Sequence, residues 1–237
     1  MSFYRIADLL VETEFNFDLT RDISAPYLTD EGVPDISFAV SKEQCVAYAE
    51  KFKIPEQADR FEYMMSGTEF YNNLLNFNGM MLHASGVVVE NRAYLFSAKS
   101  GTGKSTHTSL WLKKFGDKAF IINDDKPAVR YIDGKVFVYG TPFSGKNNLN
   151  SNARAELAGI CFIERAQENS IEEIPPGVSI PLMLEQTQRK REYKHMDKLL
   201  YVMDKILSST KVYKLRCNMD ISAADLSYKV MSEGAIK

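Results

Sequence analysis

The sequence predicts an α/β fold, in which a mixed, largely antiparallel β-sheet has flanking helices and a small N-terminal α+β layer. Three observations lead to this prediction. Two pairs of apolar runs are each joined by a short polar turn, which is typical of β-hairpins. A glycine-rich loop separates an apolar run from a helix-like segment, and a nearly continuous apolar strand follows further along the chain.

The composition is that of an ordinary globular protein. The chain has 237 residues, of which 45% are hydrophobic and 25% charged, and this length allows one substantial core with a small appendage. The net charge of -2 gives no overall attraction to nucleic acid or to an anionic membrane. Apolar runs stay well short of the ~20 residues that a membrane span needs. We therefore expect no nucleic-acid partner and no membrane partner.

The cysteines and the N-terminus favour a cytoplasmic location. Cys45, Cys161 and Cys217 are far apart in the sequence, and they form no pair with metal-ligand spacing. The first residues lack the basic-then-apolar layout of a signal peptide. A reducing cytoplasm is the simplest compartment for such a chain.

Residues 1–77 are predicted to form an α+β subdomain packed on a larger domain of residues 78–237. Residues 36–40 alternate like a strand, and Ser41 and Gln44 fit a capping box at the start of the next helix. The aromatic-rich stretch 61–77 predicts a helix that faces the core.

The larger domain begins with the hairpin elements. Residues 82–89 and 93–96 predict one hairpin, so the strand before the glycine-rich loop pairs antiparallel with its predecessor. Residues 129–139 predict a second hairpin with Asp133 and Gly134 at its turn. The apolar run 157–164 predicts a strand that is buried on both faces.

The C-terminal third predicts helices around a last strand. Residues 175–177, Pro-Pro-Gly, are expected to break the chain, and 181–208 are mostly helical in composition, with a basic cluster at 189–191 on a solvated helix face. Residues 212–217 predict the last strand, and Ser222 begins a sequence that can cap the final helix.

Residues 97–106, Ser-Ala-Lys-Ser-Gly-Thr-Gly-Lys-Ser-Thr, predict a phosphate-binding loop between a strand and a helix. Gly101 and Gly103 let the backbone turn its amides toward an anion, where the helix N-terminus adds positive charge. Lys104 would reach the outer phosphates, and the Ser105 hydroxyl would ligate Mg²⁺. The predicted nucleotide contacts are Lys99, Ser100, Gly101, Thr102, Gly103, Lys104, Ser105 and Thr106.

Paired carboxylates follow the next apolar run, residues 119–123. Asp124 and Asp125 allow a division of labour, in which one carboxylate holds the metal and the other takes a proton from an attacking hydroxyl. We assign Asp125 to the metal together with Ser105, and Asp124 to the base, while the reverse assignment stays open. The alternative for this turn-rich stretch is an exposed turn with no chemical role.

Together with His83, these motifs resemble the catalytic domain of HPr kinase/phosphorylase and, more distantly, ATP-dependent phosphoenolpyruvate carboxykinase. The resemblance covers residues 82–165. In the HPr kinase pattern a histidine followed by a small residue precedes the loop by one hairpin, and His83 matches it. The resemblance implies a P-loop core of the HPr kinase/PEP carboxykinase type, the use of ATP and Mg²⁺, and catalytic roles for Lys104, His83, Asp124 and Asp125.

The chain also departs from the HPr kinase pattern. Residues 1–77 differ from the N-terminal domain of that family, and its glycine-rich C-terminal signature is not found. The acceptor HPr is therefore not implied. HPr kinases are typically hexamers, so a homo-oligomer is one outcome that the resemblance allows.

These observations predict a kinase that moves the γ-phosphoryl group of ATP to a hydroxyl of a protein, a peptide or a small molecule. Two alternatives stay open, a non-catalytic nucleotide-binding regulator and a carboxykinase-like lyase. His83 can equally be a structural histidine. Positive charge near the predicted site comes from Lys126, Arg130, Lys146 and Arg165.

Overall fold

A computed structural model describes residues 1–190 and 192–234 of the chain. The chain divides into two compact units, Met1–Leu74 and Leu75–Lys237. None of the helices in the described ranges combines the length and the apolar composition that crossing a membrane requires.

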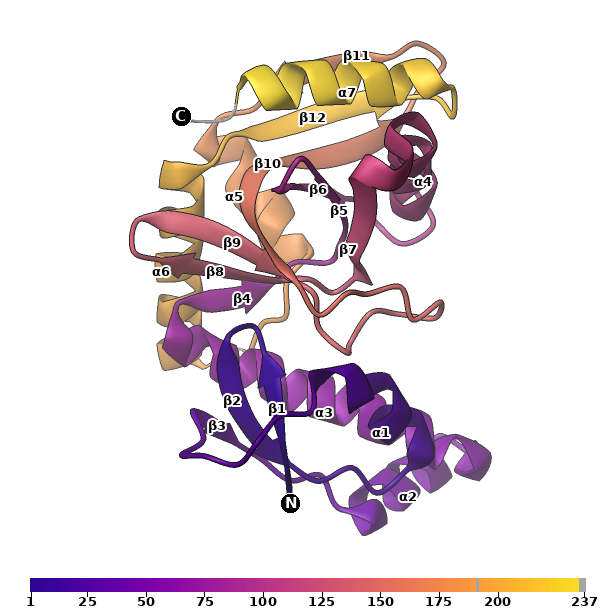
Figure 1. The fold of residues 1–237 in the computed structure, drawn as a ribbon, viewed down its shortest axis with the longest axis vertical. Coiled ribbons are helices and arrows are strands. Elements are labelled where there is room, and N and C mark those ends of the chain that lie inside the picture. Colours follow the sequence, from indigo (N-terminus) through magenta and orange to yellow (C-terminus); the bar gives the residue numbers. More distant parts are fainter. Residues whose placement is uncertain (191, 235–237) are drawn as a thin grey trace. The chain divides into compact units, whose positions relative to one another are not determined.

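The first unit is a small α+β structure. Its elements are β1 (Ser2–Ile6), β2 (Leu9–Thr13), α1 (Asp18–Ser24), β3 (Ile36–Ser37), α2 (Lys42–Lys51) and α3 (Ala58–Leu74), with short 3₁₀ turns at Ala25–Tyr27 and Pro55–Gln57. Strands β1 and β2 form an antiparallel hairpin, and β3 pairs parallel with β2 (Figure 1).

Two predictions for this unit can be compared with its structure. The capping box before α2 is confirmed, because the Ser41 side chain accepts from the Gln44 amide while the Gln44 side chain accepts from the Ser41 amide. The predicted strand 36–40 is wrong in length, since β3 ends at Ser37. The carbonyl of Val40 accepts a hydrogen bond from the Asn16 side chain at 2.9 Å instead of joining a strand ladder.

The second unit alternates strands with a few helices. Its elements are a 3₁₀ turn (Leu75–Phe77), β4 (Gly79–Met81), β5 (Ala84–Val89), β6 (Arg92–Ser97), α4 (Lys104–Phe115), a 3₁₀ turn (Gly116–Lys118), β7 (Ala119–Asp125), β8 (Ala128–Ile132), β9 (Lys135–Tyr139), β10 (Arg154–Arg165), β11 (Ser170–Glu173), α5 (Pro176–Glu185), α6 (Tyr193–Ser209), β12 (Val212–Cys217) and α7 (Ile221–Glu233).

The sheet of this unit is mixed and curled. The strands run in the order β4-β8-β9-β10-β6-β5-β7, and β12 pairs with β10 and β11 (Figure 1). Strand β10 is parallel to β6 and to β12, whereas the other pairs are antiparallel. Both predicted hairpins, β5-β6 and β8-β9, are confirmed, as is the mixed α/β class.

Helices bury both faces of the sheet. On one face, α4 and α7 pack over a cluster that includes Trp111, Phe96 and Met231. On the other face, a second cluster joins the sheet to α5 and α6 through residues such as Met183 and Ile206. Strand β10 is apolar on both sides because it lies between these two layers, as its sequence predicted.

Three predictions for the C-terminal third are wrong in detail. Residues 175–177 start α5 rather than break the chain: Pro175 is the N-cap, and Pro176 occupies the first helical position, where its missing N–H costs nothing. The segment 181–208 is two helices, and Arg189 and Lys190 lie between them rather than on a helix face, while Arg191 lies outside the described residues. The cap predicted at Ser222 lies elsewhere: Asp220 caps α7, since its side chain accepts from the Ser222 amide at 2.9 Å.

Candidate functional site

Strand register brings the distant motifs to one edge of the sheet. Ala84, the first residue of β5, lies opposite Ser97 at the end of β6 and opposite Asp125 at the end of β7. Because β6 and β7 are both antiparallel to β5, they both end where β5 begins. His83 immediately precedes Ala84, so His83, the start of the glycine-rich loop and the aspartate pair meet at this edge.

The loop between β6 and α4 has the backbone form that its glycines allow. Gly101 has φ of 77° and Gly103 has φ of 127°, values that L side chains rarely adopt. Helix α4 begins at Lys104, so the first amides of the helix face the space enclosed by the loop.

Lys104 is largely buried beneath this loop. Its Nζ donates to the Ala98 carbonyl at 3.0 Å. Burial lowers the pKa of Lys104, and the negative charges of Asp125 and Asp124 partly offset this effect. The ammonium group is therefore held inside the loop, facing the carboxylate pair.

Arg165 braces the loop from the neighbouring strand. Strand β10 is parallel to β6, with Phe162 opposite Ser97, so the last residue of β10 reaches the loop. The Arg165 guanidinium donates to the Thr102 carbonyl at 2.9 Å and also to the Gly101 carbonyl. Because the guanidinium satisfies these two carbonyls, the loop amides remain available to donate to another acceptor.

The two aspartates point to different partners. Asp124 is buried beside α4, and its Oδ1 accepts a hydrogen bond from the Ser105 hydroxyl at 2.9 Å. Asp125 instead lies 3.2 Å from His83 Nε2 and forms an ion pair with Lys126. Consecutive residues of a strand face opposite sides, which explains the divergence.

The surroundings of Asp125 keep it ionised. Burial acts to raise the pKa of Asp125, but hydrogen bonds and positive charge from His83 and Lys126 outweigh it and hold the pKa well below its ordinary value of 3.8. The backbone of Asp125 is also strained, with φ of 152°. Such a conformation costs about 1–3 kcal/mol and occurs most often where function requires it.

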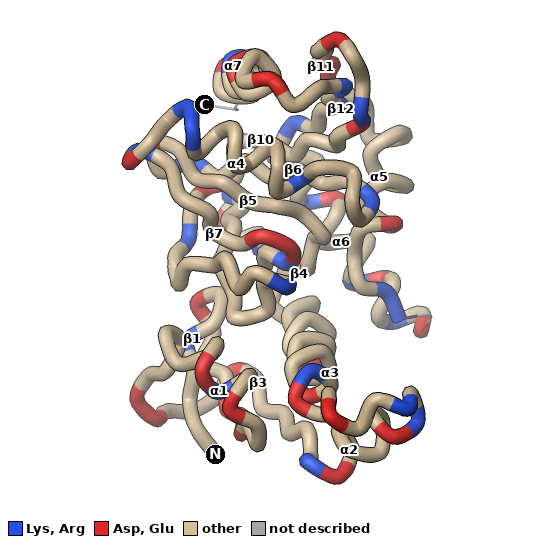
Figure 2. The backbone as a smooth tube through the Cα atoms, turned by 90° about the vertical axis from the view of Figure 1, so that its right-hand side faces the viewer, with Lys and Arg blue, Asp and Glu red and all other residues tan. Residues whose placement is uncertain are grey.

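These groups surround a cavity of about 320 Å³. Figure 2 shows acidic residues beside basic residues at the end of β7, near which this cavity lies. The cavity combines loop glycines, cations and carboxylates, and it is lined by His83, Ser100, Gly101, Gly103, Lys104, Ser105, Thr106, Asp124, Asp125, Gly145, Lys146, Asn147 and Arg165.

Most of the sequence-predicted site residues therefore lie together, but some do not. Lys99 and Thr102 line a different cavity, on the side of the loop toward α5. Lys126 reaches the site through Asp125. Arg130 lies on β8, where its Nε donates to the Phe77 carbonyl at 3.2 Å, and it does not line the cavity.

Sequence reasoning missed the residues that hold the site in place. The buried Asn123 side chain donates to the Thr141 carbonyl at 3.1 Å and accepts from the Lys126 amide at 2.8 Å, which fixes the turn after the aspartates. The Gln186 side-chain oxygen lies 2.9 Å from His83 Nδ1, and the backbone carbonyl of Gln186 accepts from the His83 backbone amide at 2.7 Å. These partners are distant in sequence and match no motif.

The site fits a magnesium ion that is shared with phosphates. Among the described residues, no three His, Cys, Asp or Glu side chains gather into a metal-binding cluster. Mg²⁺ commonly takes only one or two carboxylates together with substrate phosphates and waters. The Ser105 hydroxyl and the Asp124 carboxylate, hydrogen-bonded to each other beside the loop, are ligands of that kind.

Comparison with known proteins shows a distant structural similarity. A scan against protein-family models matches none, and a search of curated proteins gives no match. Among solved structures, the chain is similar to the HPr(Ser) kinase/phosphatase from Coxiella burnetii, with 13% identity and a TM-score of 0.35, over 65% of this chain and 99% of that one. A similarity this distant leaves the function to be argued from the site itself.

Proposed function

We propose that this protein is an HPr-kinase-like phosphotransferase that uses ATP and Mg²⁺. It moves the γ-phosphoryl group to a hydroxyl of a protein, peptide or small-molecule acceptor. One observation carries the proposal: a P-loop-like turn with Lys104, a Ser105–Asp124 pair and a His83–Asp125 pair all line the same cavity. Phosphate-holding groups and a carboxylate for the acceptor therefore face the same space.

The loop side of the cavity suits a triphosphate. Backbone amides at the start of α4 and the Lys104 ammonium supply the positive charge, and Arg165 keeps the loop carbonyls turned away. Lys146 adds a further cation to the lining of the cavity. Fixed donors of this kind stabilise the negative charge that develops during phosphoryl transfer.

The proposed metal ligands are Ser105 and Asp124, which exchanges the two aspartate roles assigned from sequence. The 2.9 Å hydrogen bond between these two side chains supports the exchange, since one ion can take the place of the shared hydrogen. When bound there, Mg²⁺ would neutralise part of the charge of the phosphates.

Asp125 is the proposed base toward the acceptor hydroxyl. The low pKa of Asp125 makes it a weak base. A weak base is sufficient because the transition state of phosphoryl transfer is loose, so the acceptor hydroxyl needs little deprotonation before the phosphoryl group is transferred. The carboxylate can orient the hydroxyl and accept its proton, while His83 holds the carboxylate in position.

The His83–Asp125 pair also favours catalysis over nucleotide binding alone. A binding module needs the loop, Lys104 and a metal ligand, but it gains nothing from a second carboxylate in a strained backbone conformation. A strained backbone conformation persists only where the surrounding structure enforces it, and such residues cluster at active sites and ligand-binding sites.

Transfer of label from γ-labelled ATP tests this proposal. The full-length protein is incubated with Mg²⁺, labelled ATP and soluble extract of the source organism, and protein and small-molecule fractions are counted separately. We expect one labelled product, which Lys104→Ala and Asp125→Asn abolish. The matched controls are Lys113→Ala and Asp117→Asn, at exposed positions on α4 and after it.

Two outcomes contradict the proposal in different ways. If the protein binds Mg-ATP and labels nothing beyond the Asp125→Asn background, it is a nucleotide-binding module. If Mg-ATP does not bind at all, or binds equally well to Lys104→Ala, the site is not a nucleotide site.

A further inference from the structure

A second cavity, of about 470 Å³, adjoins the phosphate side of the site. Thr102, Gly103, Thr106 and Arg165 line this cavity, and all of them except Thr102 also line the cavity at the aspartates. The two spaces therefore meet across the loop and the first turn of α4. A ligand held by its phosphates at the first cavity therefore has the second cavity beside it.

The second cavity differs from the first in chemistry. None of the described residues that line it carries a carboxylate, and its walls are mainly apolar side chains from α4, the end of β10 and the segment after β12, namely Leu110, Ile163, Ala166, Cys217 and Met219. Polar atoms come from the loop, from Thr106 and from Asn218. Pockets of this size and composition are typical of sites for small organic molecules rather than for bare anions.

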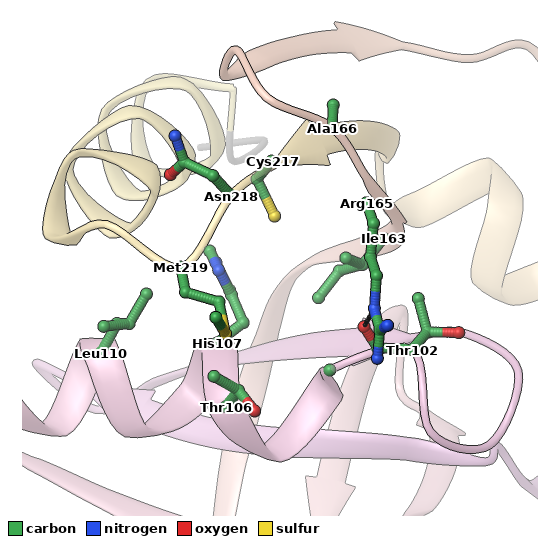
Figure 3. Close-up of a pocket in the computed structure, with 11 residues that line it drawn as sticks. Thr102, Thr106, His107, Leu110, Ile163, Arg165, Ala166, Cys217, Asn218 and Met219 are labelled. Atoms are coloured by element: carbon green, nitrogen blue, oxygen red, sulfur yellow. Dashed lines mark hydrogen bonds between the residues drawn. The ribbon is translucent and has the colours of Figure 1, made fainter.

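Arg165 and Met219 lie on opposite sides of this cavity (Figure 3). Arg165 uses edge N–H groups to hold the loop carbonyls, which leaves a face of its planar guanidinium for stacking. Met219 is 78% exposed, so its side chain can adjust to a ligand. A flat aromatic ring between them would gain a cation–π contact on one side and a sulfur contact on the other.

The cavity wall also includes His107, one of whose ring nitrogens lacks a hydrogen-bond partner among the described residues. Nε2 of His107 has two partners, the Ser227 hydroxyl at 3.0 Å and the Trp111 indole N–H at 3.2 Å, and the ring proton can sit on either nitrogen. The other nitrogen, Nδ1, is buried and has no hydrogen-bond partner within the described part of the chain. A polar atom of a bound nucleoside would give it one.

From these observations we infer that the second cavity binds the purine base and ribose of the nucleotide. The inference rests on the proposed function, because the triphosphate at the loop is what places the base. A two-ring base suits the site better than a one-ring base, since its two larger faces cover more of Arg165 on one side and of Met219 on the other.

Direct binding of Mg-ATP, Mg-CTP and magnesium tripolyphosphate to the full-length protein separates the base from the phosphates. Calorimetry gives a Kd for each. We expect Mg-ATP to bind about tenfold or more tightly than either of the others. Met219→Ala should weaken Mg-ATP about three- to tenfold, and Ala166→Phe, which fills the cavity, about tenfold or more.

Both variants should leave the tripolyphosphate Kd unchanged, which also shows that they are folded. Met64→Ala, at an exposed methionine of α3, is the matched control. The inference is overturned if Mg-ATP binds no more tightly than tripolyphosphate or Mg-CTP, or if neither cavity variant weakens the binding of Mg-ATP. In either case phosphate binding at the loop, and with it the proposed function, still stands. If tripolyphosphate and Mg-ATP both fail to bind the native protein, both proposals fall.

Discussion

His83 Nε2 lies 3.2 Å from Asp125 Oδ1, although the two residues belong to different strand ends. The contact depends on β5, because Ala84 is the register partner of Asp125 and His83 is the residue before it. Gln186, after α5, contacts the other ring nitrogen of His83. A side chain far from the loop in sequence thus orients the ring that holds the proposed base.

Gln186→Leu should therefore impair turnover without impairing nucleotide binding. Leucine offers Nδ1 of His83 no hydrogen bond, so the ring can turn away from Asp125, and we expect kcat to fall about tenfold while the Kd of Mg-ATP stays unchanged. Gln186→Glu, which retains an oxygen acceptor, should recover most of the activity. The exposed Gln167→Leu is the control. An equal loss in Gln186→Leu and Gln186→Glu would contradict a positioning role.

Backbone strain at Asp125 gives a second prediction. Asp125→Gly and Asp125→Ala both remove the side chain that meets His83 and Lys126, but only glycine tolerates φ of 152°. We expect the glycine variant to unfold at higher urea concentration than the alanine variant, by about 1 kcal/mol or more in unfolding free energy. Both should be inactive in transfer assays. Equal stability of the two variants would show that this backbone stores no strain.

The sequence predicted the scaffold of the site well because the scaffold depends on local patterns. The β5-β6 and β8-β9 hairpins follow from short turns between apolar runs, and the capping box at Ser41 follows from two residues three positions apart. The hairpin alone places His83 beside the loop. Its prediction needed no knowledge of the rest of the chain.

Long-range partners could not be predicted in the same way. The contacts of Asn123 with Thr141 and of Gln186 with His83 join residues that share no spacing rule. The two aspartates had to face opposite sides of β7, but which one faces α4 depends on the register with β5, which shifts between Gly86 and Val87. The sequence therefore left their roles open.

Buried His107 should make stability depend on pH. Burial lowers its pKa from 6.5 to about 4, so the unfolded chain binds its proton more readily than the folded protein does. Stability contributed by the neutral ring is fully present above pH 6.5 and is lost as the pH falls toward 4, by a total of about 3 kcal/mol. Urea unfolding of the native protein between about pH 4 and 7 measures this slope.

His107→Gln provides the comparison for that measurement. The glutamine can still accept the Trp111 indole hydrogen bond, but it does not titrate. We expect a flatter pH dependence than in the native protein over the same range. An unchanged slope would assign the pH dependence to other groups.

The dependence of transfer activity on Mg²⁺ concentration distinguishes the roles of the two aspartates. If Asp124 holds the metal with Ser105, Asp124→Asn weakens a metal ligand, so its transfer activity should rise again as Mg²⁺ is increased to tens of millimolar. Asp125→Asn removes the base and should stay inactive at every Mg²⁺ concentration. The measurement is initial rate against Mg²⁺ at saturating ATP for both variants. Recovery of Asp125→Asn rather than Asp124→Asn would restore the assignment made from sequence, with Asp125 on the metal. Because the two side chains are neighbours in one strand and face different partners, the two variants serve as controls for each other.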